Sequence, residues 1–317
     1  MSAPYRSLTV TPREAGMRVD VYLSARFDGL SRTAVARAIR AGEIASNERT
    51  LKPSSLLHPN EELRVTIPEL APQTPPPPCP PVLYEDDRVL AFDKPSGLLM
   101  HPVGRSFTWG LINLARIRFP DEELHLAHRL DRETSGVTLV ARDADANRWL
   151  KAVFKGRAVE KTYWAIVRGQ VPWTERVIDA PLGDDEASPI RLKRAVRPDG
   201  QPAVTRTRVL WRGEDITLVE CAPETGRTHQ IRVHLDHVGF PILGDKIYGQ
   251  PPEVFLSLFE DRDMPARDDL LGHPRHCLHA RALSFPHPDG DVRTVTAPIP
   301  EDFQPVLGSF REVEQGS

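Results

Sequence analysis

A proline-rich segment near the start of the chain limits its possible folds more than any other feature. Seven of the thirteen residues from Glu69 to Pro81 are proline. Proline fixes φ and has no N–H, so this segment suits neither a helix interior nor a central strand. We expect an extended, semi-rigid spacer between two domains rather than a proline-rich ligand for a partner, because folded patterns lie on both sides of it.

The length of 317 residues is also enough for about two domains. The sequence therefore predicts four segments: an N-terminal module over residues 1–68, a linker over 69–81, a large domain over 82–306 and a tail over 307–317.

Composition excludes several classes of protein. No apolar run approaches the ~18 residues of a membrane span, and the first residues lack the apolar segment of a signal peptide, so we expect a cytoplasmic protein. The three cysteines are widely spaced and form no Cys-x-x-Cys pair, which predicts free thiols. The net charge of −3 argues against a generally basic nucleic-acid binder.

Charge is nevertheless uneven along the chain. Between Asn147 and Arg168 there are six cations and one acid, Glu160. This strip either faces phosphate groups or forms a solvated helix face. The cations are Arg148, Lys151, Lys155, Arg157, Lys161 and Arg168.

The stretch from His128 to Gly136 places a carboxylate, Asp131, close to arginines and just before an apolar run, Val137 to Ala141. The apolar run predicts a strand and Ser135-Gly136 predicts a turn, so Asp131 should lie on a loop at a sheet edge. Neighbouring cations favour its ionised form. The residues alone leave open a surface ion-pair cluster instead of a reactive group.

Residues 128–136, His-Arg-Leu-Asp-Arg-Glu-Thr-Ser-Gly, closely resemble the signature of the RluA-type pseudouridine synthases. Similar matches occur at the Lys-Pro-Ser-Gly-Leu segment from Lys94, and in residues 226–232 and 239–249. The resemblance implies an α+β domain with a mixed, largely antiparallel sheet flanked by helices. It also implies that Asp131 is the catalytic carboxylate, with Arg232 as its ion-pair partner.

The same resemblance assigns further roles. Tyr163 would stack on the target base and remove its proton, although by pattern alone it would more often be a core aromatic. Arg129 would replace the flipped base in the RNA stack. We expect RNA contacts from seven residues: His128, Arg129, Arg132, Lys161, Arg227, His229 and Gln230. Lys94 and His101 are weaker candidates for RNA contact.

Local patterns around these motifs predict two helices and a strand. Asp143 or Asp145 caps a helix that ends at Gly156, with a buried side made of Trp149, Leu150, Val153 and Phe154. A half-buried strand follows over Lys161–Val167. The second helix is capped by Thr228 and stopped by Gly239.

The N-terminal module shows two short helical patterns followed by strands. Ser31 is expected to cap the second helix and Gly42 to end it. The module resembles the alpha-L RNA-binding domain named after a small-subunit ribosomal protein, at residues 18–20, 30–32, 39–42 and 59–63. Where that family has Val-Asn-Gly, this chain has Ser46-Asn47-Glu48, which adds a negative charge and predicts weakened RNA affinity.

These features predict an enzyme that isomerises uridine to pseudouridine in ribosomal or transfer RNA, as a monomer and with no small-molecule cofactor. Whether Asp131 acts as nucleophile or base stays open. The His273–His279 segment has zinc-type ligands, but its spacing lacks two clean pairs and we expect no metal. The alternatives are a non-catalytic RNA-binding or ribosome-assembly factor, and a glycosidase-like hydrolase with Glu133 as second acid.

Overall fold

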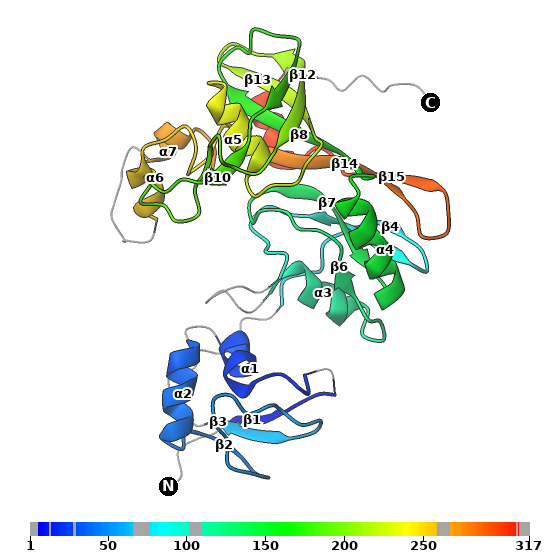
Figure 1. Cartoon of the computed structure of the whole chain (residues 1–317), viewed down its shortest axis with the longest axis vertical. Coiled ribbons are helices and arrows are strands. Elements are labelled where there is room, and N and C mark those ends of the chain that lie inside the picture. Colours follow the sequence, from blue (N-terminus) through cyan, green and yellow to red (C-terminus); the bar gives the residue numbers. More distant parts are fainter. Residues whose placement is uncertain are drawn as a thin grey trace. The chain divides into compact units, whose positions relative to one another are not determined.

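The computed structural model describes residues 6–12, 14–27, 30–65, 76–101, 109–258, 267–308 and 310. The chain divides into two compact units (Figure 1). One unit comprises residues 1–79 and 99–118, and the other residues 80–98 and 119–317. The predicted linker therefore coincides with a boundary, but the segment Leu99–Arg118, which contains helix α3 (Leu111–Arg118), groups with the first unit. Residues 69–75 and most of the predicted tail lie outside the described residues.

In the first unit, a three-stranded antiparallel sheet packs with two helices, α1 (Val19–Arg26) and α2 (Arg32–Arg40). Ser31 caps α2 as predicted, because its Oγ accepts the N–H of Ala34 at 3.1 Å. Gly42 follows the helix with φ +75°, a conformation that glycine adopts at little cost. The sheet order is β1-β3-β2, with the bounds β1 Arg6–Thr9, β2 Ile44–Ser46 and β3 Glu62–Val65.

The second unit is built on a ten-stranded sheet whose main order is β4-β5-β7-β14-β8-β13-β12-β9. β15 pairs with β14, and β6 pairs with β7. Neighbouring strands are antiparallel except for β7 and β14, so the expected mixed, largely antiparallel α+β fold is confirmed. The strands are β4 Val82–Glu85, β5 Val89–Lys94, β6 His125–Leu126, β7 Ser135–Ala141, β8 Glu160–Arg168, β9 Glu175–Asp179, β12 Val204–Arg212, β13 Ile216–Pro223, β14 Leu278–Pro286 and β15 Val292–Thr296.

Helices and a separate hairpin complete this unit (Figure 1). Helix α4 (Ala144–Lys155) contacts β6 and β7, whereas α5 (Gln230–His237) contacts β11 (Arg194–Val196), β12 and β13. The remaining elements are α4 Ala144–Lys155, α5 Gln230–His237, α6 Pro252–Leu256, α7 Arg267–Leu271, the 3-10 helix η1 Glu301–Phe303, α8 Gln304–Leu307, and the hairpin of β10 Leu182–Asp184 with β11 Arg194–Val196.

The α4 prediction was correct at both ends and for Leu150, Val153 and Phe154 on the buried side, and wrong for Trp149. Asp143 is the cap, since its Oδ1 accepts the N–H groups of Asp145 and Ala146 at 2.8 and 2.7 Å. Leu150 is buried, but Trp149 is 43% exposed. Its ring N–H donates to the carbonyl of Pro286, which keeps the indole at the surface.

The turn predicted at Ser135-Gly136 was wrong, because both residues belong to β7 and are buried. β7 is a central strand, and Asp131 lies on the loop before it rather than at a sheet edge. Gly136 has φ +108°, and a Cβ atom there would lie 2.2 Å from the carbonyl oxygen of Ala280. Close approach of β14, rather than a turn, therefore requires this glycine.

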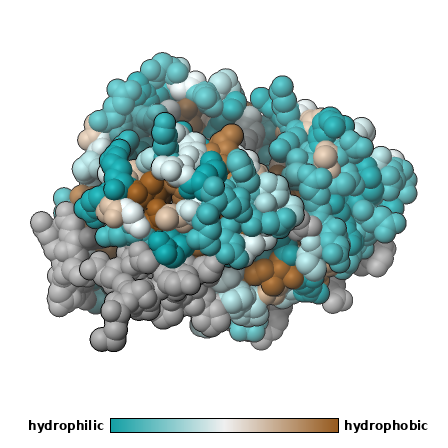
Figure 2. All heavy atoms as spheres, turned by 90° about the horizontal axis from the view of Figure 1, so that it is seen from below, coloured by the Kyte–Doolittle hydropathy of each residue, from teal (hydrophilic) through white to brown (hydrophobic). Residues whose placement is uncertain are grey.

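None of the described helices is long and apolar enough to cross a bilayer. The face of the molecule in Figure 2 is mostly hydrophilic, with apolar residues visible only in small patches.

Candidate active site

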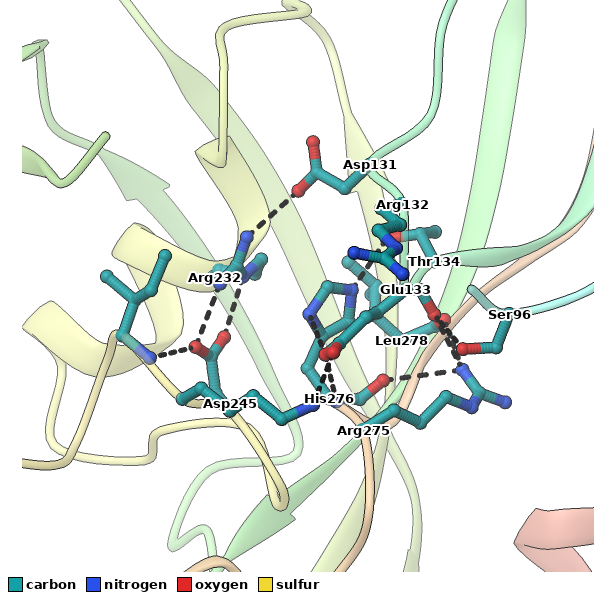
Figure 3. Close-up of polar contacts among 12 residues, drawn as sticks. Ser96, Asp131, Arg132, Glu133, Thr134, Arg232, Asp245, Arg275, His276 and Leu278 are labelled. Atoms are coloured by element: carbon teal, nitrogen blue, oxygen red, sulfur yellow. Dashed lines mark hydrogen bonds and ion pairs between the residues drawn. The ribbon is translucent and has the colours of Figure 1, made fainter. Parts of the chain in front are cut away.

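Asp131 and Arg232 meet across two elements that are a hundred residues apart in sequence. Asp131 lies on the loop before β7, and Arg232 is in the first turn of α5. Nη1 of Arg232 donates to Oδ2 of Asp131 at 3.1 Å (Figure 3). The arginine side chain is 5% exposed and the aspartate side chain 27%, so the pair is open on the aspartate side. The structure thus contains the ion pair that the sequence resemblance implied.

A second carboxylate, Asp245, fixes the orientation of Arg232. Asp245 is fully buried and accepts two hydrogen bonds from the guanidinium, at 2.6 Å from Nε and 2.9 Å from Nη2 (Figure 3). Its Oδ1 also accepts the backbone N–H groups of Ile247 and Tyr248. Because Asp245 binds the fork of the guanidinium, only Nη1 is directed at Asp131.

Lys94 holds the loop that carries Asp131. Its Nζ donates to the carbonyls of Pro95, Leu98 and Arg132 at 2.9–3.0 Å, and the side chain is fully buried. Burial lowers the pKa of Lys94 to about 7. All three ammonium hydrogens are used, so the lysine joins two loops and does not face RNA, contrary to the weak prediction that it could.

Glu133, the next residue of the loop, is tied to other elements of the same unit. The carboxylate of Glu133 pairs with Lys246 and accepts the backbone N–H of His276 at 3.3 Å. The carbonyl of Glu133 accepts from Ser96 Oγ at 2.9 Å and from Arg275 at 3.1 Å (Figure 3). Asp131 is therefore mounted on a loop with fixed neighbours, which suits a site that needs a defined geometry.

The charges around Asp131 keep it ionised. Burial is the largest single influence and would raise the pKa of this carboxyl, but the surrounding groups, Arg232 foremost, together outweigh burial and hold the pKa below its usual value. His229 Nε2 lies 3.8 Å from Oδ2 of Asp131. Burial, reinforced by Arg232, lowers the pKa of His229 to about 4, so this ring is neutral near pH 7.

A cavity of about 490 Å³ opens beside Asp131, a volume within the range of small-molecule pockets. The residues that line it come from the Asp131 loop, the end of α4, β8, the end of β13 and the loop after it, the start of α5, and the first residue of β14. Six cations and two carboxylates line it: Arg129, Lys155, Arg157, Lys161, Arg227, Arg232, Asp131 and Glu224. An anionic ligand is therefore favoured over a cationic one.

Tyr163 lines this cavity from β8, while its neighbour Trp164 is buried in the core, as the alternation of the strand predicted. Burial and then the charge of Asp131 raise the pKa of Tyr163. The hydroxyl is thus protonated near pH 7, which disfavours the phenolate that a proton-removing role would need.

The seven residues expected to contact RNA fall into two groups. Arg129, Lys161, Arg227 and His229 line the cavity and have groups available to it. Of the other three, His128 and Gln230 also line the cavity, whereas Arg132 does not.

His128, Arg132 and Gln230 already have protein partners. His128 Nε2 accepts the N–H of Leu139 at 3.0 Å, and Arg132 Nε donates to the Gly97 carbonyl at 3.1 Å. Gln230 is buried and its amide bonds to Thr225, Val204 and the Arg227 backbone. These contacts give His128 and Gln230 a part in holding the structure, whereas Arg132 is exposed and keeps other N–H groups for RNA.

The N-terminus of α5 differs from the prediction. Thr228 is not the cap, since the residue before the helix is His229, with a left-handed φ of +58°. That conformation accompanies a contact of 2.9 Å between His229 Nδ1 and the hydroxyl of Tyr248. Gly239 ends the helix region with φ +90°, as predicted.

The histidines of the zinc-like segment have other partners. His276 Nε2 lies 2.9 Å from Thr134 Oγ1, and His279 Nδ1 lies 2.9 Å from Ser135 Oγ. His273 Nδ1 lies 2.8 Å from the Arg275 carbonyl oxygen. Among the described residues, no group of three potential ligands is placed to hold a metal ion.

Sequence reasoning missed Asp245 and Tyr248. Both lie in residues 239–249, which matched the family pattern but carried no individual role. The ring of Tyr248 lies 5.0 Å from the Arg232 guanidinium carbon, so this segment supports the arginine from two sides. The available signal was a carboxylate inside a matching motif, Gly244-Asp245-Lys246.

Comparison with known proteins agrees with this geometry. Residues 88–237 match the family model described as RNA pseudouridylate synthase. Ribosomal large subunit pseudouridine synthase D of Xanthomonas campestris is 37% identical over 98% of this chain and 94% of its own length. Ribosomal large subunit pseudouridine synthase C of Pasteurella multocida is 35% identical over 97% and 94%.

A solved structure shows the same fold. The human RNA pseudouridylate synthase domain containing 4 protein is 29% identical, with a TM-score of 0.55 over 71% of this chain and 91% of that one. The chain therefore belongs to the RNA pseudouridylate synthase family, whose members are isomerases that convert uridine in RNA to pseudouridine.

Proposed function

We propose that this protein isomerises uridines of large-subunit ribosomal RNA, with Asp131 as the catalytic carboxylate. The two relatives described above act, by their names, on the large ribosomal subunit and align over nearly the whole chain. The assignment of Asp131 rests on its ion pair with the buried Arg232, which faces a cavity lined mainly by cations.

The reaction requires little apparatus beyond this pair. The bond from the ribose C1′ to N1 of uracil breaks, the base turns, and C1′ bonds to C5, whose hydrogen moves as a proton to N1. No electrons are gained or lost overall, and no outside group is added. An ionised carboxylate can attack the sugar or the base as a nucleophile, or remove the C5 proton.

The other residues position the Asp131 carboxylate and the target base. Arg232 orients the Asp131 carboxylate through a single hydrogen bond, leaving the second oxygen, Oδ1, to face the substrate. Tyr163 stacks on the uracil, with its hydroxyl protonated. Flipping the base out of the RNA stack costs a few kcal/mol of lost stacking. Arg129, which is exposed and lines the cavity, fills the gap that the base leaves.

A glycosidase-like hydrolase is the weaker alternative. It needs a second carboxylic acid beside the scissile bond. Glu133 pairs with Lys246 and does not line the cavity, and the cavity carboxylate Glu224 pairs with Arg206 at 2.6 Å. Neither is placed as a free proton donor.

Residues 1–68, which belong to the first unit, are proposed to form an alpha-L-like RNA-binding domain that adds modest affinity. Arg37 and Arg40 are exposed on α2, whereas Arg32 is paired with the buried Asp20 at 2.9 Å. Glu48 is exposed as well. We further propose that the enzyme acts in the cytoplasm as a monomer and without a small-molecule cofactor, on ribosomal rather than transfer RNA.

Mapping of pseudouridine in RNA from cells with and without the gene tests this proposal. A chemistry that marks pseudouridine should show specific large-subunit positions that are lost on deletion and restored by the intact gene. Loss of marks only in transfer RNA would contradict the proposed substrate. Unchanged marks in all RNA would favour the non-catalytic RNA-binding alternative.

A further inference from the structure

Left-handed backbone conformations gather at the cavity. Of the three non-glycine residues with positive φ among those described, Arg157 (φ +60°) and His229 (φ +58°) both line it. Such conformations are costly for residues with a Cβ and concentrate at functional sites. The left-handed conformation of His229 is explained by its contacts with Tyr248 and Asp131. Arg157, in contrast, has no part in the chemistry described above.

Arg157 occupies the position where a helix usually ends in glycine. Its N–H donates to the carbonyl of Phe154 at 3.2 Å, and the N–H of Ala158 donates to Val153 at 2.9 Å. These two bonds form a Schellman motif, in which the left-handed residue is normally glycine. The available glycine, Gly156, lies one residue earlier with φ −73°. Backbone preference therefore does not explain an arginine at this position.

Arg157 belongs to a cluster of three cations, Lys155, Arg157 and Lys161, that all line the cavity. None of the three forms an ion pair with a described carboxylate. Lys161 donates one hydrogen bond, to the Thr225 carbonyl at 3.1 Å. Burial, with the charge of Arg157, lowers the pKa of Lys161 to about 8. Three cations thus line one cavity without ion-pair partners of their own, and a bound anion would stabilise them.

The dipole of α4 explains only part of this cluster. Cations are favoured near the C-terminal end of a helix, which accounts for Lys155. It does not account for a left-handed arginine, nor for Lys161 on β8, which faces the same cavity.

We propose that Lys155, Arg157 and Lys161 bind a phosphate group of the RNA backbone beside the target uridine. This inference rests on the proposed function, because it takes the nucleotide in the cavity to be part of RNA. Since Asp131 and the cluster line one cavity of about 490 Å³, the phosphate belongs to the target nucleotide or its immediate neighbour. Such a site increases the affinity for RNA and fixes the position of the RNA backbone, but it does not recognise the base sequence.

The salt dependence of RNA binding tests the site in the full-length protein. The probe is a fluorescent single-stranded oligouridylate, and its dissociation constant is measured from about 50 to 200 mM KCl. Lys155→Ala and Arg157→Gly should each reduce the log–log slope by about 0.7, and the double variant by about 1.4. Lys151→Ala is the matched control, because Lys151 is exposed one turn earlier on α4 and does not line the cavity.

A second readout separates function from folding. Arg157→Gly should bind RNA less tightly yet melt at the same temperature as wild type or higher, because glycine relieves the left-handed residue. A purely structural arginine would instead lower the melting temperature and leave the slope unchanged. In turnover assays the double variant should raise KM far more than it lowers kcat.

The outcomes distinguish this inference from the proposed function. If wild type makes no pseudouridine, the proposed function fails, while the slopes still report on the phosphate site. If wild type is active and the double variant keeps the slope of the Lys151→Ala control, the phosphate site is overturned.

Discussion

Replacing Asp245 by asparagine should damage catalysis and stability together, although Asp245 does not line the cavity. The carboxylate is fully buried, accepts two hydrogen bonds from Arg232 and caps the backbone N–H groups of Ile247 and Tyr248. Asparagine can keep the oxygen that accepts the backbone groups. Its NH2 group then meets Nε of Arg232, so two donors face each other and a buried charge loses its partner.

The size of the effect follows from these contacts. Removing one partner of a buried ion pair costs about 3–5 kcal/mol, and we expect the lower end because one acceptor is kept. That corresponds to a fall in Tm of roughly 6–12 °C for a domain of this size. Arg232 then loses its fixed orientation toward Asp131, and misplacement of about 1 Å costs up to ~100-fold in rate.

Differential scanning fluorimetry and single-turnover kinetics measure the two effects in one preparation. Glu220→Gln is the control, because Glu220 makes a partly exposed ion pair with Arg208 and should contribute less than about 1 kcal/mol. RNA affinity should stay near wild type in both variants. An Asp245→Asn protein with the control's Tm and rate would refute the view that Asp245 positions Arg232.

Three further predictions test other parts of the account. Tyr163→Phe should keep RNA binding, because stacking survives, and should lower turnover only if the hydroxyl takes part; equal losses in both would indicate a packing role. Gly136→Ala should destabilise the protein by more than about 4 kcal/mol, because its Cβ would lie 2.2 Å from a backbone oxygen of β14, and normal expression with an unchanged Tm would contradict this. Removal of residues 1–68 should remove only one or two phosphate contacts, each of which lowers the slope of log affinity against log salt by about 0.7–0.9; a much larger fall in the slope would show that this module is not weakened.

The fold class and the Asp131–Arg232 pair could be predicted because the sequence resembles a known family, whose motifs occur here in the same order. Tyr163 on β8 followed from alternation along one strand. These features are local, or are carried by a family pattern that spans most of the large domain.

Features that depend on close tertiary approach were missed. Gly136 looks like a turn residue in sequence, and only the neighbouring β14 backbone shows why glycine is needed there. Lys94 looks like an exposed loop lysine, yet three carbonyls from two loops surround it. Asp245 lies thirteen residues after Arg232, a spacing that no helix or strand period relates to a contact.

The most direct test of the central claim is tritium release from RNA labelled at C5 of uracil, because joining C5 to the ribose expels the hydrogen at that carbon. Purified wild-type protein should release tritium from large-subunit ribosomal RNA prepared from cells that lack the gene. Asp131→Asn, which keeps shape and loses only the charge, should bind the same RNA and release none above background. Substantial release by the pure Asp131→Asn protein would contradict the assignment of Asp131 as the catalytic carboxylate.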